Sequence, residues 1–172
     1  PGVMLRDLEA AGGIMISGSH NPPEYNGFKM LTSEGSFFGA DILKLGEIAA
    51  AGNYRSGQGS QETREVFDDY VARMAADYDG DRDRDLKVAW DAGNGSAGRA
   101  MEVLCDMLPG EHILLNEKID GTFPAHHPDP TMPENLEQLI RTVIDEGCDF
   151  GFAFDGDGDR IGMVDGQGRI LW

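Results

Sequence analysis

The sequence has 172 residues, of which 40% are hydrophobic and 26% are charged. This length suffices for one ordinary domain, or for one domain and part of another, and the composition is typical of a globular protein rather than a disordered or membrane-embedded one. The formal net charge is −17, from 31 acidic and 14 basic residues. This charge argues against nucleic acid or an anionic membrane surface as a partner.

The first residues lack the basic start and apolar stretch of a secretory signal, and no apolar run is long enough to cross a bilayer, so we expect a cytoplasmic protein. Cys105 and Cys148 stand alone in apolar segments, which favours reduced core residues over a disulfide. The sequence opens with a helix already under way and ends inside a predicted strand. It therefore looks like a piece of something longer.

In chain order, the N-terminal part is predicted to contain a helix over 5–11, strands over 14–17 and 28–31, and a helix over 41–51. The segment GSHNPPEYNG, residues 18–27, is rich in turn formers and is expected to form a loop between the two strands. Residues 51–60 are rich in Gly, Ser, Gln and Asn, which indicates a surface linker.

From residue 66 onward, strands alternate with helices, which is typical of an α/β layer with strands in the middle and helices outside. The predicted elements are helices over 66–76, 99–108 and 134–146, strands over 86–92, 112–120 and 148–155, and a hairpin over 161–172 with its turn at 165–168. The charged run at 79–85 is expected to be a solvated loop. The proline-rich segment 121–133 is expected to lack regular structure.

Three carboxylates occupy alternate positions directly after an apolar strand: Asp155, Asp157 and Asp159, with glycines between them. Glycine lets the backbone curl tightly, so the carboxylates can converge on one hard cation, whereas without a cation they repel one another. Oxygen-only ligands favour magnesium or calcium. An EF-hand is excluded because Arg160 and Gly166 stand where that loop needs a glycine and a bidentate glutamate. An acidic turn that binds nothing is the alternative.

The loop at 18–27 offers a second group of reactive side chains. Ser19 stands beside His20, with Lys29 shortly downstream, so a hydroxyl, a titratable partner and a cation come from one compact segment. Taken alone, the loop is better explained as a connecting turn, since Asn-Pro-Pro and Asn-Gly are turn formers. Considered together with the three carboxylates at 155–159, however, Ser19, His20 and Lys29 are candidate functional residues.

Two strings, GSHNPPEYNGFK at 18–29 and FDGDGDR at 154–160, together resemble the α-D-phosphohexomutases. The resemblance extends through DAGNGSAG and GTFPAHHPDPTMPENL and covers essentially the whole chain in the same order. The residues of PPEYNGFK and HHPDP are more similar to the bifunctional phosphomannomutase/phosphoglucomutase group than to phosphoglucosamine mutases.

The resemblance implies an α/β fold with a mixed sheet flanked by helices, as in the repeated domains of phosphohexomutases. Residues 1–65 would be the C-terminal part of domain 1, with the phosphoserine loop, and residues 66–172 would be domain 2, with the magnesium-binding loop. The loops that the family carries in its third and fourth domains, for sugar specificity and phosphate binding, have no match here. The isolated fragment is therefore expected to be inactive, and the preferred sugar cannot be read from it.

The resemblance also implies the site. Ser19 would be phosphorylated in the resting enzyme. The ligands of Mg²⁺ would be Ser19, Asp155, Asp157 and Asp159. Arg160 would contact phosphate or substrate, and His20 and Lys29 would lie beside the transferring group, with either as the candidate general base and Lys29 also as a substrate contact. The full enzyme would interconvert hexose 1-phosphate and hexose 6-phosphate (mannose or glucose) through a bisphosphorylated sugar. Its partners would be the phosphorylated hexose and the missing domains.

Two other enzyme or binding classes remain open. GNGSAG, residues 93–98, follows a strand and precedes a helix, as in a dinucleotide-binding fingerprint with Glu117 as the acidic residue. A tight strand-to-helix turn is the favoured explanation, because a lone glycine fingerprint is a weak signal. The Asp-x-Asp pattern also permits an aspartyl-phosphate phosphatase with Asp155 as nucleophile and Asp157 as acid. Asp159 and the unexplained serine loop argue against that class.

His126 and His127 are candidate metal ligands, but no cysteine or further histidine stands at ligand spacing, so they are expected to be loop residues held between prolines. A non-enzymatic role, as a folded fragment or interaction piece, is the remaining alternative.

Overall fold

The computed structural model describes residues 8–22, 24–78, 80 and 85–172. The chain divides into two compact units. The N-terminal unit consists of the residues up to Ser17 together with Gly27–Val66, and the C-terminal unit consists of Gly18–Asn26 together with Phe67–Trp172. The serine loop between the first two strands therefore groups with the C-terminal unit.

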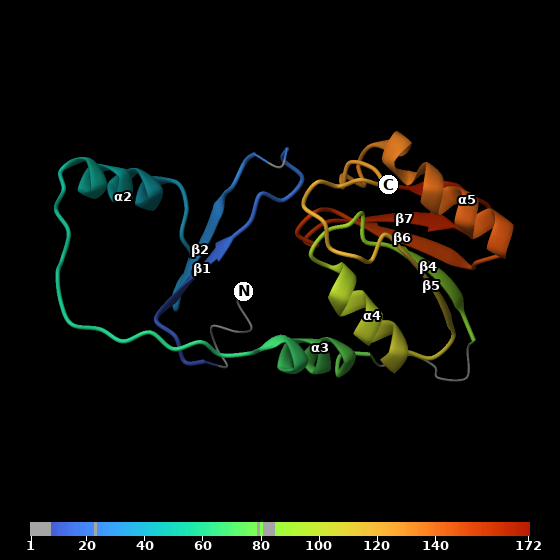
Figure 1. The fold of residues 1–172 in the computed structure, drawn as a ribbon, viewed down its shortest axis with the longest axis horizontal. Helices are drawn as coiled ribbons and strands as arrows, with labels where there is room; N and C mark the ends of the chain where they lie inside the picture. Colours follow the sequence, from blue (N-terminus) through green and yellow to red (C-terminus); the bar gives the residue numbers. More distant parts are fainter. Residues whose placement is uncertain (1–7, 23, 79, 81–84) are drawn as a thin grey trace. The chain divides into compact units, whose positions relative to one another are not determined.

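The N-terminal unit contains a three-stranded antiparallel sheet in the order β1-β2-β3, followed by one helix. Its elements are β1 (Gly12–Ile16), β2 (Phe28–Thr32), β3 (Gly35–Ser36) and α2 (Ala40–Ala50) (Figure 1). None of the residues of α2 is buried. The two predicted strands and the second predicted helix are confirmed within a few residues. Of the helix predicted over 5–11, residues 8–11 contain no helix, and residues 5–7 lie outside the described residues.

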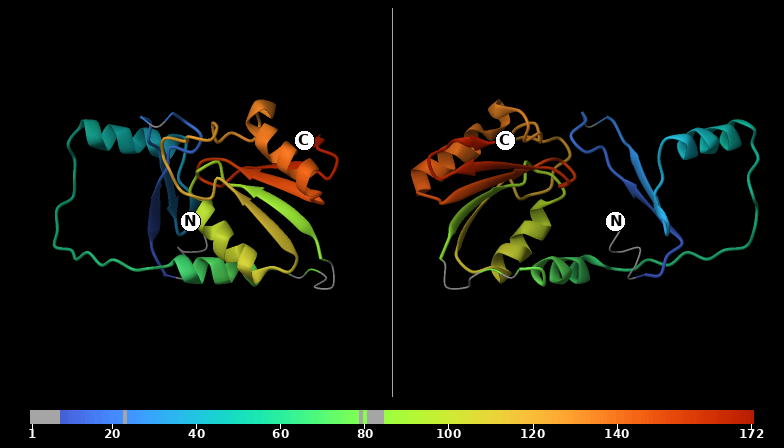
Figure 2. Two further views of the ribbon diagram at one scale, coloured as in Figure 1. Left: turned by 45° about the vertical axis from the view of Figure 1, so that its right-hand side comes forward. Right: turned by 180° about the vertical axis from the view of Figure 1, so that it is seen from behind.

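The C-terminal unit is built on a five-stranded mixed sheet in the order β5-β4-β6-β7-β8. Figure 2 shows the ribbon of this unit from two further directions. Its strands are β4 (Lys87–Asp91), β5 (Glu111–Leu115), β6 (Phe150–Phe154), β7 (Ile161–Asp165) and β8 (Ile170–Leu171). Its helices are α3 (Phe67–Ala75), α4 (Gly98–Met107), the short 3-10 helix η1 (Pro133–Leu136) and α5 (Glu137–Glu146). Strand β4 pairs in parallel with both β5 and β6, and the hairpin β7–β8 adds antiparallel strands.

Helix α5 covers one face of this sheet, and α3 and α4 lie on the other face (Figure 1). Leu139 and Val143, four residues apart on α5, are fully buried and lie in the core cluster with residues of β4, β6 and β7. Small residues of β6 make room for them, because a β-carbon at Gly151 would lie 2.7 Å from Val143 Cγ2. Each fully buried side chain of this size contributes about 1.5–3 kcal/mol. Gly147, in the left-handed region, ends the helix.

The α/β alternation and the hairpin at 161–172 are confirmed. The strand predicted over 112–120 was too long, because β5 ends at Leu115 and Asn116 adopts a left-handed conformation with φ 53°. Its side-chain amide donates to Asp91 Oδ1 at 2.9 Å, which draws the chain out of the sheet. Within the charged run 79–85, residues 79 and 81–84 lie outside the described residues.

Both cysteines are buried free thiols, as the sequence analysis predicted. Burial raises the pKa of Cys105 to about 11, so its thiol stays protonated and unreactive at neutral pH. None of the helices described is both long enough and apolar enough to cross a bilayer.

Candidate functional site

The site lies at the edge of the sheet where parallel strands β4 and β6 end. The turn after β4 and the Asp loop after β6 are brought side by side there, and the backbone N–H of Ser96 donates to the carbonyl oxygen of Gly156 at 3.0 Å. A β-carbon at Gly95 would lie 2.8 Å from that same carbonyl oxygen. The glycines of GNGSAG therefore permit close backbone packing against the Asp loop.

Asp155, fully buried, organises the Asp loop. Its Oδ1 accepts hydrogen bonds from the backbone N–H groups of Asp159 and Arg160, both at 3.0 Å. Its Oδ2 accepts from the hydroxyl of Ser19 at 2.8 Å and from Arg160 Nε at 3.2 Å. One buried carboxylate thus closes the loop on itself and ties it to a serine 136 residues away in the sequence.

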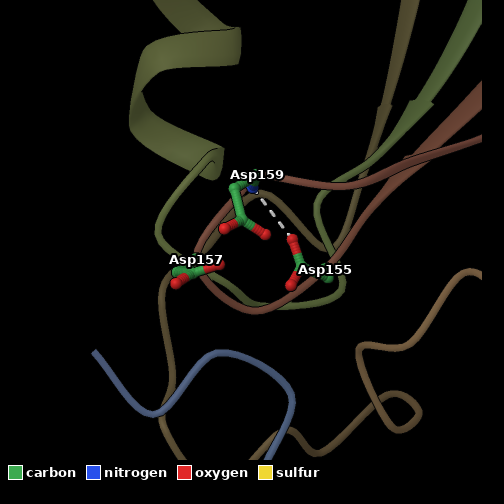
Figure 3. A group of neighbouring side chains, drawn as sticks. All are labelled: Asp155, Asp157 and Asp159. Carbon is green, nitrogen blue, oxygen red and sulfur yellow. Dashed lines mark hydrogen bonds between the residues drawn. The ribbon is translucent and has the colours of Figure 1, made fainter. Parts of the chain in front are cut away.

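The three carboxylates of the loop face a common space (Figure 3). One oxygen from each of Asp155, Asp157 and Asp159 can be chosen so that all lie within 4.8 Å of one another. Oxygens around one Mg²⁺ ion lie at most about 4.2 Å apart, and those around Ca²⁺ at most about 5.2 Å apart. The all-oxygen donor set and its spacing therefore fit a hard divalent cation after at most a small contraction.

Ser19 is held in a strained backbone conformation, with φ 52°. A non-glycine residue in this left-handed region costs about 1–3 kcal/mol, and such strain is found at functional sites. The hydroxyl of Ser19 lies 3.2 Å from His20 Nδ1 in addition to its bond to Asp155. The carbonyl oxygen of Ser19 packs so closely against Gly156 that no β-carbon fits there.

Arg160 is shared between two carboxylates. Its Nε donates to Asp155, and its Nη1 lies 3.3 Å from Oδ1 of Asp129. Its Nη2 is buried and has no hydrogen-bond partner among the described residues. The guanidinium is thus oriented by two anions and retains a donor for a third group.

Asp129 is a site residue that the sequence analysis did not identify. Burial raises the pKa of its carboxyl, but hydrogen bonds from Thr131 and the charges of Arg160 and His20 outweigh that effect, and the pKa lies below its usual range. Asp129 is therefore an anion at neutral pH. Its signal in the sequence was its place between two prolines in HHPDP, which no local rule connects to Arg160.

Lys29 lies half-buried on β2, in the N-terminal unit, whereas the residues described above belong to the C-terminal unit. His126 faces the carboxylate of Asp91, with His126 Nε2 at 2.9 Å from Asp91 Oδ2. Among the residues that the structure describes, the Asp loop is the single cluster of three ligand-type side chains close enough to share an ion.

Replacing Gly156 with alanine should push the Ser19 loop away from the Asp loop, because the new methyl group would collide with the carbonyl oxygen of Ser19. We expect a loss of about 1–3 kcal/mol of stability from overpacking, together with faster amide hydrogen exchange across residues 18–26. Gly121→Ala is the matched control, since a β-carbon at Gly121 meets nothing within 4 Å. Equal exchange in the two variants would contradict the packing described here.

The fold and the site define an α/β protein that presents a serine hydroxyl to a loop of three carboxylates. The family profile described as phosphoglucomutase/phosphomannomutase, alpha/beta/alpha domain II, matches residues 68–168, and the profile for domain I of the same family matches residues 2–54. The chain belongs to the phosphoglucomutase/phosphomannomutase family, which confirms the family and the fold class expected from the sequence.

Comparison with individual proteins agrees with this family assignment. The chain is 41% identical over 165 residues to a phosphomannomutase/phosphoglucomutase of Pseudomonas aeruginosa, covering 96% of this chain and 35% of the relative. A crystal structure of a family protein from Burkholderia thailandensis is 42% identical with a TM-score of 0.88, covering 95% of this chain and 35% of that one. The chain thus spans about a third of these relatives.

A more distant structure, an N-acetylphosphoglucosamine mutase of Aspergillus fumigatus in complex with GlcNAc-6P and magnesium, is 14% identical with a TM-score of 0.53. The alignment covers 93% of this chain and 45% of that one, and at this identity it shows the fold alone. Nothing in the fold or in these relatives favours dinucleotide binding or an aspartyl-phosphate phosphatase.

Proposed function

We propose that the full-length protein interconverts hexose 1-phosphate and hexose 6-phosphate, with mannose or glucose as the sugar, through a phosphoserine at Ser19. The observation that carries this proposal is the hydrogen bond from the Ser19 hydroxyl to Asp155, inside the three-carboxylate cluster. The reaction class is supported by the relative named phosphomannomutase/phosphoglucomutase. Transfer through a phosphoserine passes by way of a bisphosphorylated sugar.

The Asp loop is proposed to hold Mg²⁺ through Asp155, Asp157 and Asp159, with an oxygen on Ser19 as a further ligand. A carboxylate has about four lone-pair sites, and those of Asp155 are taken by four donors, one of them the Ser19 hydroxyl. Phosphorylation removes that proton and sets an anion beside Asp155. The negative charges of the phosphoserine and of Asp155 then favour a cation between them. Mg²⁺ would neutralise the charge that develops on a transferring phosphoryl group.

The remaining roles are proposed for three basic side chains. Arg160 is proposed to bind phosphate oxygens through Nη2, which is buried, already oriented, and without a partner among the described residues. His20 is the candidate to exchange a proton near the phosphoserine, since its Nδ1 lies 3.2 Å from Ser19 Oγ. Lys29 is proposed as a substrate contact or as the alternative base, on the family resemblance alone.

The domain boundaries and the setting are proposed in the same way. Residues 1–65 would be the end of the family's first domain and residues 66–172 its second, which the profile matches to 2–54 and 68–168 support. The phosphorylated hexose and the rest of the enzyme would be the partners. A cytoplasmic location and the inactivity of this chain alone remain predictions.

Intact mass and phosphosite mapping of the full-length protein, before and after exposure to a hexose 1,6-bisphosphate, test the proposal. We expect one added phosphate, located on Ser19 and stable to acid and to hydroxylamine, as a phosphoester is. A label on Asp155 that hydroxylamine removes would instead indicate the phosphatase chemistry. One phosphate on any residue other than Ser19 would overturn the mechanism.

A further inference from the structure

A partly buried histidine–aspartate pair lies at the same edge of the sheet as the site. Nε2 of His126 lies 2.9 Å from Oδ2 of Asp91, and Nδ1 of His126 lies 3.0 Å from the carbonyl oxygen of His127. Both ring nitrogens therefore face acceptors, which an imidazolium satisfies by donating from each. The hydrogen bond that His126 donates to Asp91 also raises the pKa of His126, although burial opposes this effect. Asp91 is fully buried.

The other oxygen of Asp91 is tied into the protein frame. Oδ1 accepts from the backbone N–H of Gly93 and from Nδ2 of Asn116, each at 2.9 Å. These donors follow β4 and β5, so Asp91 is immobilised at the edge of the sheet where those strands end. His126 is consequently anchored to the sheet through Asp91.

We give the name HHPDP loop to residues 126–130, which His126 anchors at its start. Pro128 is fully buried and lies 3.5 Å from the place that a β-carbon would take on Gly156 of the Asp loop. Pro130 packs against Gly162, where a β-carbon would lie 2.9 Å from Pro130 Cβ. The two prolines thus rest against one glycine inside the Asp loop and one in β7, and Asp129 stands between the prolines.

Asp129 contacts the guanidinium of Arg160 at a different nitrogen from the one that contacts Asp155. Arginine has a long, flexible side chain, so one contact through Nε would leave its outer nitrogens free to swing. The second contact, from Nη1 to Asp129, fixes the plane of the group. Nη2 is then held in one orientation, from which it can donate to an incoming anion.

We propose that Asp129 is a positioning residue for Arg160 and that the partly buried Asp91–His126 pair fixes the HHPDP loop so that Asp129 stays in place. The catalytic part of this inference rests on the proposed function, whereas its structural part does not. A loop that served stability alone would not control the state of the Arg160 side chain.

The test uses the full-length protein labelled with ¹⁵N-arginine, with Arg160→Lys to assign the signal of Arg160 Nε–H. Asp129→Ala should accelerate hydrogen exchange of that group by about tenfold or more and lower kcat by about 10- to 100-fold, as loss of a supporting hydrogen bond does at comparable sites. Asp129→Asn keeps an oxygen at the Oδ1 position and should recover part of both losses.

Asp120→Ala is the matched control. Asp120 accepts from the backbone and hydroxyl of Thr122 at 2.9 and 2.7 Å, much as Asp129 accepts from Thr131 at 3.1 and 2.7 Å. Among the described residues, no arginine contacts Asp120. The Asp120→Ala variant should therefore change neither the Arg160 signal nor kcat.

His126→Phe should reproduce the effects of Asp129→Ala, and the double variant should be no worse than Asp129→Ala alone, because both act on one guanidinium. His126→Gln, whose amide still donates toward Asp91, should retain most of the wild-type signal, and His127→Gln should behave as wild type because only its backbone carbonyl is used.

An unchanged Arg160 signal in Asp129→Ala would overturn the inference, as would fully additive losses in the double variant. If His126→Phe fails to fold, Asp129→Ala and His126→Gln still test whether Asp129 positions Arg160. If the wild-type protein shows no mutase activity while the Arg160 signal responds as expected, the proposed function fails and the positioning role stands.

Discussion

Replacing Ser19 with alanine should lower the rate of hexose phosphate interconversion by about 10⁴-fold or more, the scale seen when a nucleophile is removed. Alanine has no oxygen to carry a phosphoryl group. The surroundings should survive the change, because Asp155 keeps the donors from Asp159 and Arg160. The lost hydrogen bond should cost only about 1 kcal/mol of folding stability.

The measurement is a coupled assay of the full-length enzyme with hexose 1-phosphate, run beside intact mass analysis. Ser96→Ala is the matched control, since Ser96 is exposed and contacts the same Asp loop through its backbone N–H. The control should keep wild-type activity and the single phosphate. Activity of Ser19→Ala within about tenfold of wild type would exclude a phosphoserine mechanism at this residue.

Replacing Asp155 with asparagine should weaken Mg²⁺ binding by more than about 100-fold, since even outer-shell changes at metal sites cost about 10- to 100-fold. The amide has one oxygen and one NH₂ group, whereas all four partners of Asp155 are donors. Two donors would therefore face a donor in a buried place, and Arg160 would lose a counter-charge. Breaking a buried charge pair in this way costs about 3–5 kcal/mol.

Asp165→Asn provides a close comparison on the neighbouring strand. Oδ1 of Asp165 accepts from the backbone N–H groups of Gln167 and Arg169, and Oδ2 accepts from Arg169 Nε, so the local hydrogen bonding resembles that of Asp155. Asp165 lacks the serine and the other two carboxylates. Calorimetric titration with Mg²⁺ should show wild-type affinity for Asp165→Asn. Equal affinities in the two variants would mean that the Asp loop is not the metal site.

The Asp loop could be predicted because its information is local. Alternating aspartates and glycines after an apolar strand indicate a tight loop whose carboxylates can converge, and periods of two and of about 3.6 residues identify strands and helices. The same local rules misjudged the end of β5, where the tertiary bond from Asn116 to Asp91 turns the chain out of the sheet. They also predicted a helix where residues 8–11 have none.

By itself, therefore, the sequence determined the alternation of elements, the carboxylate loop and, through its resemblance, the family. Only the tertiary structure decided that the Ser19 hydroxyl reaches Asp155, that GNGSAG packs on the Asp loop, and that Asp129 orients Arg160. The reason is physical. Backbone geometry relates residues a few positions apart, whereas the order β5-β4-β6 brings together the ends of strands that lie tens of residues apart in the chain.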